Sequence, residues 1–434
     1  MSSQLIDARR ERSGMVGKNS KARNALRALV IRGLSNIEGG KLRICDERGE
    51  VTVGDHGDVI ATIHVHDSRF YSSVALGGSM GASDAYINGW WSSNDLVGML
   101  RLMIQNIGET DRLGWMTDLL RRPFELMGNV LRRNSIRGSL RNIHAHYDLG
   151  NEFFEVFLDP TMCYSSGIFP SSESTLEEAS TTKLDRLIDK MNIGESDRLL
   201  EIGTGWGAMA VRAAERTGCE VLTTTISQEQ AVGARSRVSE SACSNQITIV
   251  EEDYRRLTGV HDRIVAVEMI EAVGHRYLPE FFANCDRLLA PDGLLALQLI
   301  AMPDHRYARY LRTTDFIREV VFPGSCCPSL GAVVAGARSV SNLDVIHLED
   351  MSGHYAETLC RWRMAFMGRL DVVRNQGFDD RFIRMWEYYL AYCEAGFAER
   401  YVHSFQAIMG RSGGVDVGVV SPLPKSPYCG GATS

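Results

Sequence analysis

Between residues 198 and 300, short apolar runs alternate with longer stretches whose apolar residues recur at helical spacing. Short apolar runs suit strands that are buried on both faces, and helices between them are the usual connections in a parallel sheet. The expected strands are 198–202, 220–226, 247–250, 263–269 and 294–300, and the expected helices are 206–217, 228–242 and 277–289. This pattern predicts an α/β fold with helices on both faces of a parallel sheet.

The segments on either side of this alternation differ from it. Residues 21–110 mix helical and strand-like patterns, which predicts a small α+β domain. Its expected elements are a helix from Lys21 to about Gly33, strands near 41–53 and 58–66, and two later helices; after the sheet we expect helices near 355–374 and 379–399 and a strand at 403–409. The expected divisions are a disordered N-terminus at 1–20, an N-terminal domain at 21–110, a basic linker at 111–141, an α/β domain at 142–410 and a flexible tail at 411–434.

Composition narrows the class of protein. A chain of 434 residues is expected to form two domains, and its net charge of −7 disfavours nucleic-acid binding. The ten cysteines show no paired metal-ligand spacing, so we expect reduced thiols and no metal site. No apolar run approaches the roughly 18 residues of a membrane span, which favours a cytoplasmic protein that contacts a membrane only from its surface.

The stretch "LLEIGTGWG" at 199–207 ends the first strand of the expected sheet and opens a helix. Ligands of such sheets bind at strand-to-helix turns, where glycines let the backbone approach the ligand closely. Gly203, Gly205 and Gly207 follow the spacing G-x-G-x-G after Glu201, which is shorter than a dinucleotide fingerprint and typical of S-adenosylmethionine sites. A tight turn without a ligand is the alternative.

The next two strands supply further candidates for that cofactor. The second strand lacks the usual acidic ribose ligand at its end and offers Thr225 and Gln230 instead. After the third strand, Tyr254 is placed to stack on an adenine and Asp253 to accept from its exocyclic amine. An acid and an aromatic residue at a strand end are also compatible with a cap and a core side chain.

Seven ordered blocks resemble the cyclopropane fatty acid synthases and the mycolic acid cyclopropane synthases. They are "HYDLGNEFFEVFLDPTMCYSSGIF" (146–169), "LLEIGTGWG", "TISQEQ" (225–230), "DYRRL" (253–257), "DRIVAVEMIEAVG" (262–274), "VFPGSCCPS" (321–329) and "HYAETLCRW" (354–362). The stretch "GGSMGASDAYINGWW" (77–91) also resembles the bacterial synthases that act on intact phospholipids. The resemblance covers roughly residues 60–410 and implies a Rossmann-like class I methyltransferase sheet with a smaller N-terminal lipid-binding domain that also forms dimer contacts.

The resemblance also implies a reaction. The cis double bond of an acyl chain attacks the methyl group of S-adenosylmethionine, and a base then removes a proton so that a cyclopropane ring closes. In this family the base is thought to be bound bicarbonate. The cofactor contacts that it implies are Tyr164, Ser165, Gly203, Thr204, Gly205, Thr225, Gln230, Tyr254 and Arg255, to which the strand ends add Glu201 and Asp253.

The implied anion site contains Glu271 at the end of the fourth strand, the backbone amide of Ile300, and Tyr355. Glu271 as a helix-capping acid and Tyr355 as an interdomain packing residue are the alternatives. Three positions depart from the family: Ser166 replaces a cysteine, Gln298 replaces a histidine, and Ala272 stands where histidine is frequent. Proton loss from a neighbouring carbon would give a methylene-branched or methylated unsaturated chain, so the sequence predicts C-methylation more firmly than ring closure.

A protein without a membrane span must reach a double bond inside a bilayer, and the basic linker offers one route. Its arginines would attract an anionic membrane surface, or else form interdomain salt bridges. Trp90 and Trp91 are expected to fill the core of the small domain, with an acyl path as the alternative. A methyltransferase for a soluble small molecule and a catalytically silent lipid-binding protein are the competing functions.

Overall fold

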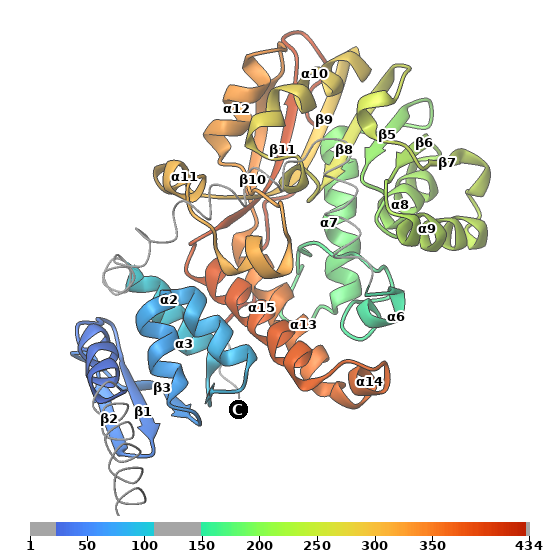
Figure 1. Cartoon of the computed structure of the whole chain (residues 1–434). Coiled ribbons are helices and arrows are strands. Elements are labelled where there is room, and N and C mark those ends of the chain that lie inside the picture. Colours follow the sequence, from blue (N-terminus) through green and yellow to red (C-terminus); the bar gives the residue numbers. More distant parts are fainter. Residues whose placement is uncertain (1–22, 108–148, 431–434) are drawn as a thin grey trace, which may run out of the picture. The chain divides into compact units, whose positions relative to one another are not determined.

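The computed structural model describes residues 23–107 and 149–430 (Figure 1). The described residues form two compact units. Unit 1 contains 23–107 and 378–395, and unit 2 contains 149–377 and 396–430. The N-terminus expected at 1–20 and the basic linker expected at 111–141 lie outside the described residues.

Unit 2 is built on a seven-stranded sheet in the order β10-β11-β9-β8-β5-β6-β7. The strands are β5 (Arg198–Ile202), β6 (Glu220–Thr224), β7 (Ile247–Val250), β8 (His261–Val267), β9 (Leu289–Ala301), β10 (Asp344–Asp350) and β11 (His403–Gly410). The five strands from β7 to β9 are parallel, and β11 runs antiparallel to β9 and β10. The predicted α/β fold is confirmed, whereas β10 is absent from the sequence prediction because its polar, half-exposed pattern lacks an apolar run.

Helices cover both faces of this sheet (Figure 1). One face packs against α7 (Leu176–Met191), α8 (Ala208–Thr217) and α9 (Gln228–Glu240), and the other against α10 (Leu278–Leu288) and α12 (Leu330–Arg338). The sequence prediction also omitted α7. Its start is set by a capping box, in which the Thr175 hydroxyl accepts from the Glu178 amide and the Glu178 carboxylate accepts from the Thr175 amide.

The remaining elements of the chain after residue 148 are mostly short. They are α6 (Asn151–Phe154), η1 (Ser244–Gln246), η2 (Tyr254–Arg256), η3 (Ile270–Ala272), η4 (His275–Tyr277), α11 (Asp304–Tyr310), the π-helical turn η5 (Ile317–Val321), α13 (Ser352–Gly368), α14 (Leu370–Asn375) and α15 (Asp380–Ala398). The helix predicted at 355–374 is two helices, because the backbone leaves the helical conformation at Arg369 (φ −127°, ψ 32°). Most of α15 groups with unit 1, so that unit is discontinuous in sequence and not the single segment 21–110 that we expected.

Unit 1 contains a four-stranded sheet in the order β2-β1-β3-β4. Its elements are a helix over 23–34, β1 (Lys41–Asp46), β2 (Gly49–Val53), β3 (Val59–Val65), α2 (Arg69–Ile87), β4 (Trp91–Ser93) and α3 (Leu96–Gln105). Trp91 is buried and its indole N–H donates to the carbonyl of Ala82 at 2.9 Å, so it fills the core as expected. Trp90 is half-buried, with the Arg69 guanidinium 4.5 Å from its ring centroid.

Residues 411–430 contain no helix or strand, yet hydrogen bonds attach them to the rest of unit 2. The amide of Gly418 donates to the carbonyl of Lys190 at 2.9 Å, and the carbonyl of Ser421 accepts from Arg186 at 3.0 Å. The hydroxyl of Ser426 donates to the carbonyl of Gly353 at 2.6 Å. The Gly, Ser and Pro content that predicts a flexible tail does not show these contacts, because their partners lie far away in sequence.

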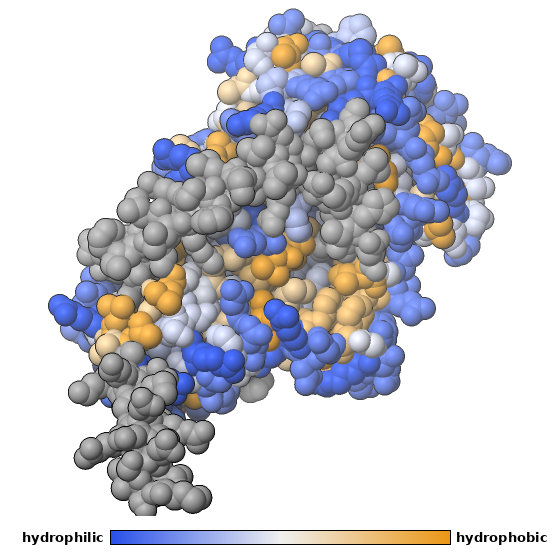
Figure 2. All heavy atoms as spheres, viewed as in Figure 1, coloured by the Kyte–Doolittle hydropathy of each residue, from blue (hydrophilic) through white to orange (hydrophobic). Residues whose placement is uncertain are grey.

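The described surface is largely hydrophilic on the face seen in Figure 2, where apolar side chains form separate patches. Among the described residues, no helix combines the length and the apolar content that crossing a bilayer would require.

Candidate active site

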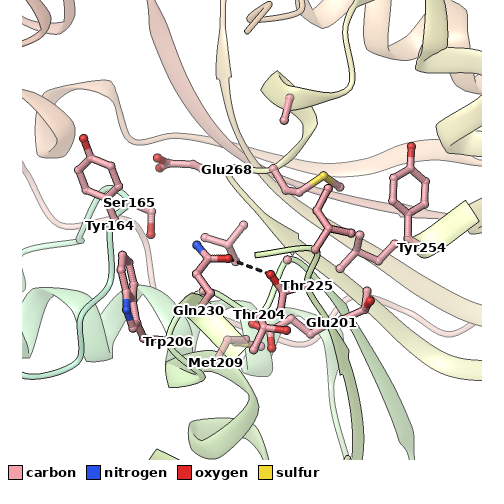
Figure 3. A pocket seen from close by; sticks show the side chains of 18 of the residues that line it. Tyr164, Ser165, Glu201, Thr204, Trp206, Met209, Thr225, Gln230, Tyr254 and Glu268 are labelled. Carbon is pink, nitrogen blue, oxygen red and sulfur yellow. Dashed lines mark hydrogen bonds between the residues drawn. The ribbon is translucent and has the colours of Figure 1, made fainter. Parts of the chain in front are cut away.

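A cavity of about 230 Å³ lies in unit 2 at the carboxyl ends of β5, β6 and β8 (Figure 3). All eleven residues that the sequence assigned to the cofactor line it: Tyr164, Ser165, Glu201, Gly203, Thr204, Gly205, Thr225, Gln230, Asp253, Tyr254 and Arg255. Tyr164 and Trp206 lie at one end of the pocket in Figure 3, and Tyr254 lies at the other. The carboxyl edge of a parallel sheet is where such folds bind ligands.

The glycine turn between β5 and α8 leaves room for a ligand. Gly203 and Gly205 have φ angles of 100° and 52°, which side chains with a Cβ rarely adopt. A Cβ added at Gly203 would lie 3.2 Å from the Met269 side chain, whereas one added at Gly205 would meet nothing within 4 Å. The space beside Gly205 therefore belongs to the cavity, and α8 begins three residues later with its N-terminus on the cavity wall.

The floor of the cavity holds polar side chains in fixed positions. The Thr225 hydroxyl donates to the Gln230 side-chain oxygen at 3.0 Å, which leaves the Gln230 amide nitrogen facing the pocket (Figure 3). Glu201 accepts from the Thr223 hydroxyl at 2.6 Å. Burial raises the pKa of Glu201 to about 8, so this carboxyl is mainly protonated at neutral pH.

The end of the cavity near Tyr254 differs in one respect from the sequence expectation. Both carboxylate oxygens of Asp253 accept from the Arg255 guanidinium, at 2.8 and 2.6 Å. Asp253 lines the cavity, but its charge is already paired with Arg255. Tyr254 meets the edge of Phe281 at 5.6 Å between ring centroids, so its position is held by core packing while the residue also lines the cavity.

Aromatic rings surround the opposite end. The Tyr164 ring lies 5.2 Å from Phe154, 5.4 Å from Trp362 and 6.5 Å from Phe322, measured between centroids. The Trp206 indole N–H donates to Asn151 at 2.8 Å, which fixes the plane of that ring. Aromatic faces attract cations and exclude water, and both effects suit a site that handles a sulfonium ion.

The five residues assigned to the anion site lie together in the structure beside this cavity, without lining it. The amide of Ile300 donates to one carboxylate oxygen of Glu271. The amide of Ser166, the side-chain amide of Gln298 and the hydroxyl of Tyr355 all donate to a different carboxylate, which belongs to Glu268 and was not predicted. These three distances are 2.9, 2.8 and 2.6 Å.

Glu271 and Glu268 have different surroundings. Strand β8 ends at Val267, and Glu271 lies on the following turn, η3, and not at the strand end. Its second carboxylate oxygen is buried and has no hydrogen-bond partner in the described part of the chain. Burial and the neighbouring charge of Glu268 raise the pKa of Glu271 to about 8. Glu268 lines the cavity and Glu271 does not.

Sequence reasoning overlooked Glu268, although a signal was present. In "AVEMIEAVG" Glu268 directly follows the last apolar residue of the strand, and side chains at that position of a parallel sheet point toward the ligand. The resemblance drew attention to Glu271, three residues later. Ala272 lines the cavity, and no cluster of His, Cys, Asp or Glu suited to a metal ion occurs within the described ranges.

Comparisons with known proteins show which sequences and structures this chain resembles. The family model described as mycolic acid cyclopropane synthetase matches residues 134–407. The chain is 38% identical over 345 residues to the tuberculostearic acid methyltransferase UfaA1 of Mycobacterium tuberculosis. The aligned region covers 77% of this chain and 80% of that protein.

This chain is 30% identical over 369 residues to the cyclopropane-fatty-acyl-phospholipid synthase of Escherichia coli. The aligned region covers 84% of this chain and 91% of that protein. The solved structure of the mycolic acid cyclopropane synthase CmaA1 complexed with SAH and CTAB matches with a TM-score of 0.58 at 29% identity. That match covers 62% of this chain and 97% of the other.

Proposed function

Because this chain belongs to the mycolic acid cyclopropane synthetase family, whose enzymes transfer a methyl group from S-adenosylmethionine to lipid double bonds, we propose that it methylates an unsaturated phospholipid acyl chain and closes a cyclopropane ring. The observation that carries the proposal is a pair of carboxyl groups, the half-buried Glu268 and the buried Glu271, at the edge of a cavity whose wall contains every expected cofactor residue.

The residues present fit S-adenosylmethionine. When bound, it supplies an electrophilic methyl group on a sulfonium centre. Gly203 and Gly205 let the backbone approach such a ligand, and the Gln230 amide nitrogen remains available for a hydrogen bond. Tyr254 offers a ring for stacking at the far end of the cavity. The aromatic rings of Tyr164 and its neighbour Trp362 would stabilise the positive charge of the sulfonium.

The chemistry of the lipid makes two demands on the protein. Water must be excluded, because it would capture the cation that forms when the double bond attacks the methyl group. A positioned base must then remove a proton. The aromatic rings around Tyr164 suit the first demand, and the carboxyl groups of Glu268 and Glu271 suit the second.

A branched product is the second candidate. The identity with a methyltransferase, UfaA1, exceeds that with the Escherichia coli cyclopropane synthase, 38% against 30%. Proton loss from the carbon next to the cation, in place of the added methyl group, would leave a double bond and a branch. Both routes add one CH₂ to the chain and release one proton, so only the structure of the product separates them.

The test is incubation of the purified chain with S-adenosylmethionine and vesicles of a monounsaturated phospholipid, followed by mass spectrometry of the released fatty esters. We expect a gain of one CH₂ with the unsaturated lipid and none with a saturated lipid of equal length. Proton NMR of the product then distinguishes upfield cyclopropyl signals from olefinic ones. Absence of any mass gain with lipids of several head groups would reject the proposed function.

We further propose that the chain works at the surface of an anionic membrane and forms a homodimer, with the basic linker at 111–141 supplying attraction. Each arginine near an anionic leaflet contributes about 1 kcal/mol. Replacing Arg132 and Arg133 with glutamate should reduce sedimentation with anionic vesicles and leave the weak binding to neutral vesicles unchanged. Equal sedimentation of variant and wild type with anionic vesicles would remove the linker from the proposal.

A further inference from the structure

We propose that the carboxylate of Glu268 occupies the anion site of this enzyme and acts there as the base, in place of a separate bicarbonate ion. The inference rests on the proposed function, because it identifies the group that removes the proton in the reaction described above. It comes from the hydrogen bonds around Glu268, from its backbone conformation and from its position on the cavity wall.

The donors that would grip an anion are already engaged by the protein. Among the implied anion ligands, Ser166, Gln298 and Tyr355 all donate to Glu268, at 2.9, 2.8 and 2.6 Å. The remaining donor, the Ile300 amide, bonds to Glu271. The residues present therefore do not fit a separate bicarbonate. A carboxylate, like bicarbonate, spreads one negative charge over two oxygens of a planar carbon, so it can accept hydrogen bonds from the same donors.

The orientation of the Gln298 amide follows from a chain of hydrogen bonds that begins at a lysine. The Lys190 ammonium can only donate, and it bonds to the side-chain oxygen of Gln406 at 2.7 Å. The Gln406 amide nitrogen then donates to the side-chain oxygen of Gln298 at 3.0 Å. The nitrogen of Gln298 consequently faces Glu268, and this side of the site presents a donor to an anion.

The backbone of Glu268 is held in an uncommon conformation. Its φ angle is 49°, one of four positive values among the described non-glycine residues, and its amide donates to the Gln298 carbonyl at 2.7 Å. A side chain in this region costs about 1–2 kcal/mol and persists where the surroundings require it. The conformation turns the carboxylate toward Tyr164 and Ser165 in the cavity, as Figure 3 shows.

Electrostatics favour a base at this position. Glu268 has no salt bridge within the described residues, and burial raises its pKa, while Lys183 and the three hydrogen bonds oppose that rise. A carboxylate with a raised pKa takes a proton more readily than one in water. Lys183 itself donates to the Ser165 hydroxyl, so its charge lies near the site without a direct bond to Glu268.

The step balances without a further reactant. The π electrons of the acyl double bond form the new bond to the methyl carbon, and the electron pair of the broken C–S bond remains on sulfur. Glu268 takes a proton from the added methyl group, and the C–H electron pair closes the ring onto the cationic carbon. The proton passes from Glu268 to solvent after product release. Ser166, Gln298 and Tyr355 act as positioning residues.

The test compares the wild type with Glu268→Gln in buffers freed of bicarbonate and in the same buffers with bicarbonate added. Removal of a general base typically costs 10²–10⁴-fold, so we expect product formation by Glu268→Gln to fall by about that factor. Affinity for S-adenosylmethionine, measured by calorimetry, should stay unchanged. We expect bicarbonate to have no effect on the wild type. Glu240→Gln, at an exposed site on α9, is the matched control.

A second variant guards against misfolding. Glu268→Gly relieves the positive φ angle and vacates the space between the three donors, so we expect it to bind carbon-13-labelled bicarbonate by NMR and to regain activity when bicarbonate is added. The wild type should not bind the label. Binding of bicarbonate to the wild type, wild-type turnover that requires it, or Glu268→Gln turnover within about threefold of the wild type would overturn the inference.

Lipid methylation and bicarbonate binding, both measured on the wild type, separate the failure of one proposal from the failure of the other. A wild type that methylates no lipid contradicts the proposed function, whatever the behaviour of Glu268. A wild type that methylates lipid and also binds bicarbonate contradicts only the assignment of Glu268.

Discussion

Two walls of the cavity, the glycine turn with Gly205 and the region around Glu268, differ in the space and the hydrogen-bond donors that they leave free for a ligand. At the glycine turn, the backbone is open, and a Cβ at Gly205 would meet no described atom within 4 Å apart from its chain neighbours. At the wall that contains Glu268, three donors converge on its carboxylate and are engaged by the protein itself. One wall is shaped to receive a ligand from solution, whereas the other carries its anion as part of the chain.

This contrast separates binding from proton transfer. A change at the glycine turn should alter affinity for the methyl donor, while a change around Glu268 should alter the step after binding. The following predictions test that division in order of decreasing expected effect.

Among changes at other positions than Glu268, the largest effect on affinity or turnover is expected for Gly205→Val. The valine side chain would enter the cavity, and a steric conflict of about 1–3 kcal/mol predicts a loss in affinity for S-adenosylmethionine of up to ~100-fold, measured by calorimetry. Gly413→Val is the matched control, because Gly413 also has a positive φ angle of 82° and nothing within 4 Å, but lies outside the cavity. Equal affinities in the two variants would contradict the open-wall interpretation.

Glu271→Gln should change stability in a pH-dependent way. The pKa of Glu271 is raised from 4.5 to about 8, so between these values the folded protein binds a proton that the unfolded chain has lost. Stability of the wild type should therefore fall as pH rises through this window.

The amide cannot ionise, so the variant should lose this decline, which amounts to about 4 kcal/mol for the wild type near pH 8. Thermal melts of both proteins from pH 5 to pH 9 measure the difference. Parallel curves would show that Glu271 is not buried as a neutral acid.

Tyr355→Phe removes one hydrogen bond to the Glu268 carboxylate and keeps the ring that stacks on Phe397 at 4.3 Å between centroids. A hydrogen bond to a charged group contributes about 1.5–3 kcal/mol, so product formation should slow by at least ~10-fold. Affinity for the methyl donor should not change. A weaker affinity with an unchanged rate would place Tyr355 on the binding wall.

The smallest effect is expected for Ser166→Ala. Ser166 holds Glu268 through its backbone amide, and within the described ranges its hydroxyl donates only to the adjacent Gly167 carbonyl, at 3.0 Å. Alanine keeps the amide, so turnover should change by less than about threefold. A loss as large as that of Tyr355→Phe would mean that the hydroxyl itself takes part.

The α/β sheet and the cofactor wall were accessible from the sequence because both depend on local patterns. Apolar runs identify strands that are buried on both faces, and the spacing of Gly203 and Gly205 marks a turn whose positive φ angles favour glycine. Strand β10 was missed because its sequence contains no apolar run, and its alternating half-exposed pattern resembles that of a loop. The attachment of residues 411–430 to unit 2 also involves partners that no local pattern reveals.

The surroundings of Glu268 depend on contacts between residues that are far apart in sequence. Ser166, Gln298 and Tyr355 are 102, 30 and 87 positions away from Glu268, and no local pattern shows that they converge on one carboxylate. By itself, the sequence determined the class of fold, because short-range apolar patterns encode strands and helices. Its resemblance to a known family supplied the methyl donor and the residues that we propose to hold it. Only the tertiary structure decided which carboxylate receives the donors, because that depends on where distant strands and helices bring them together.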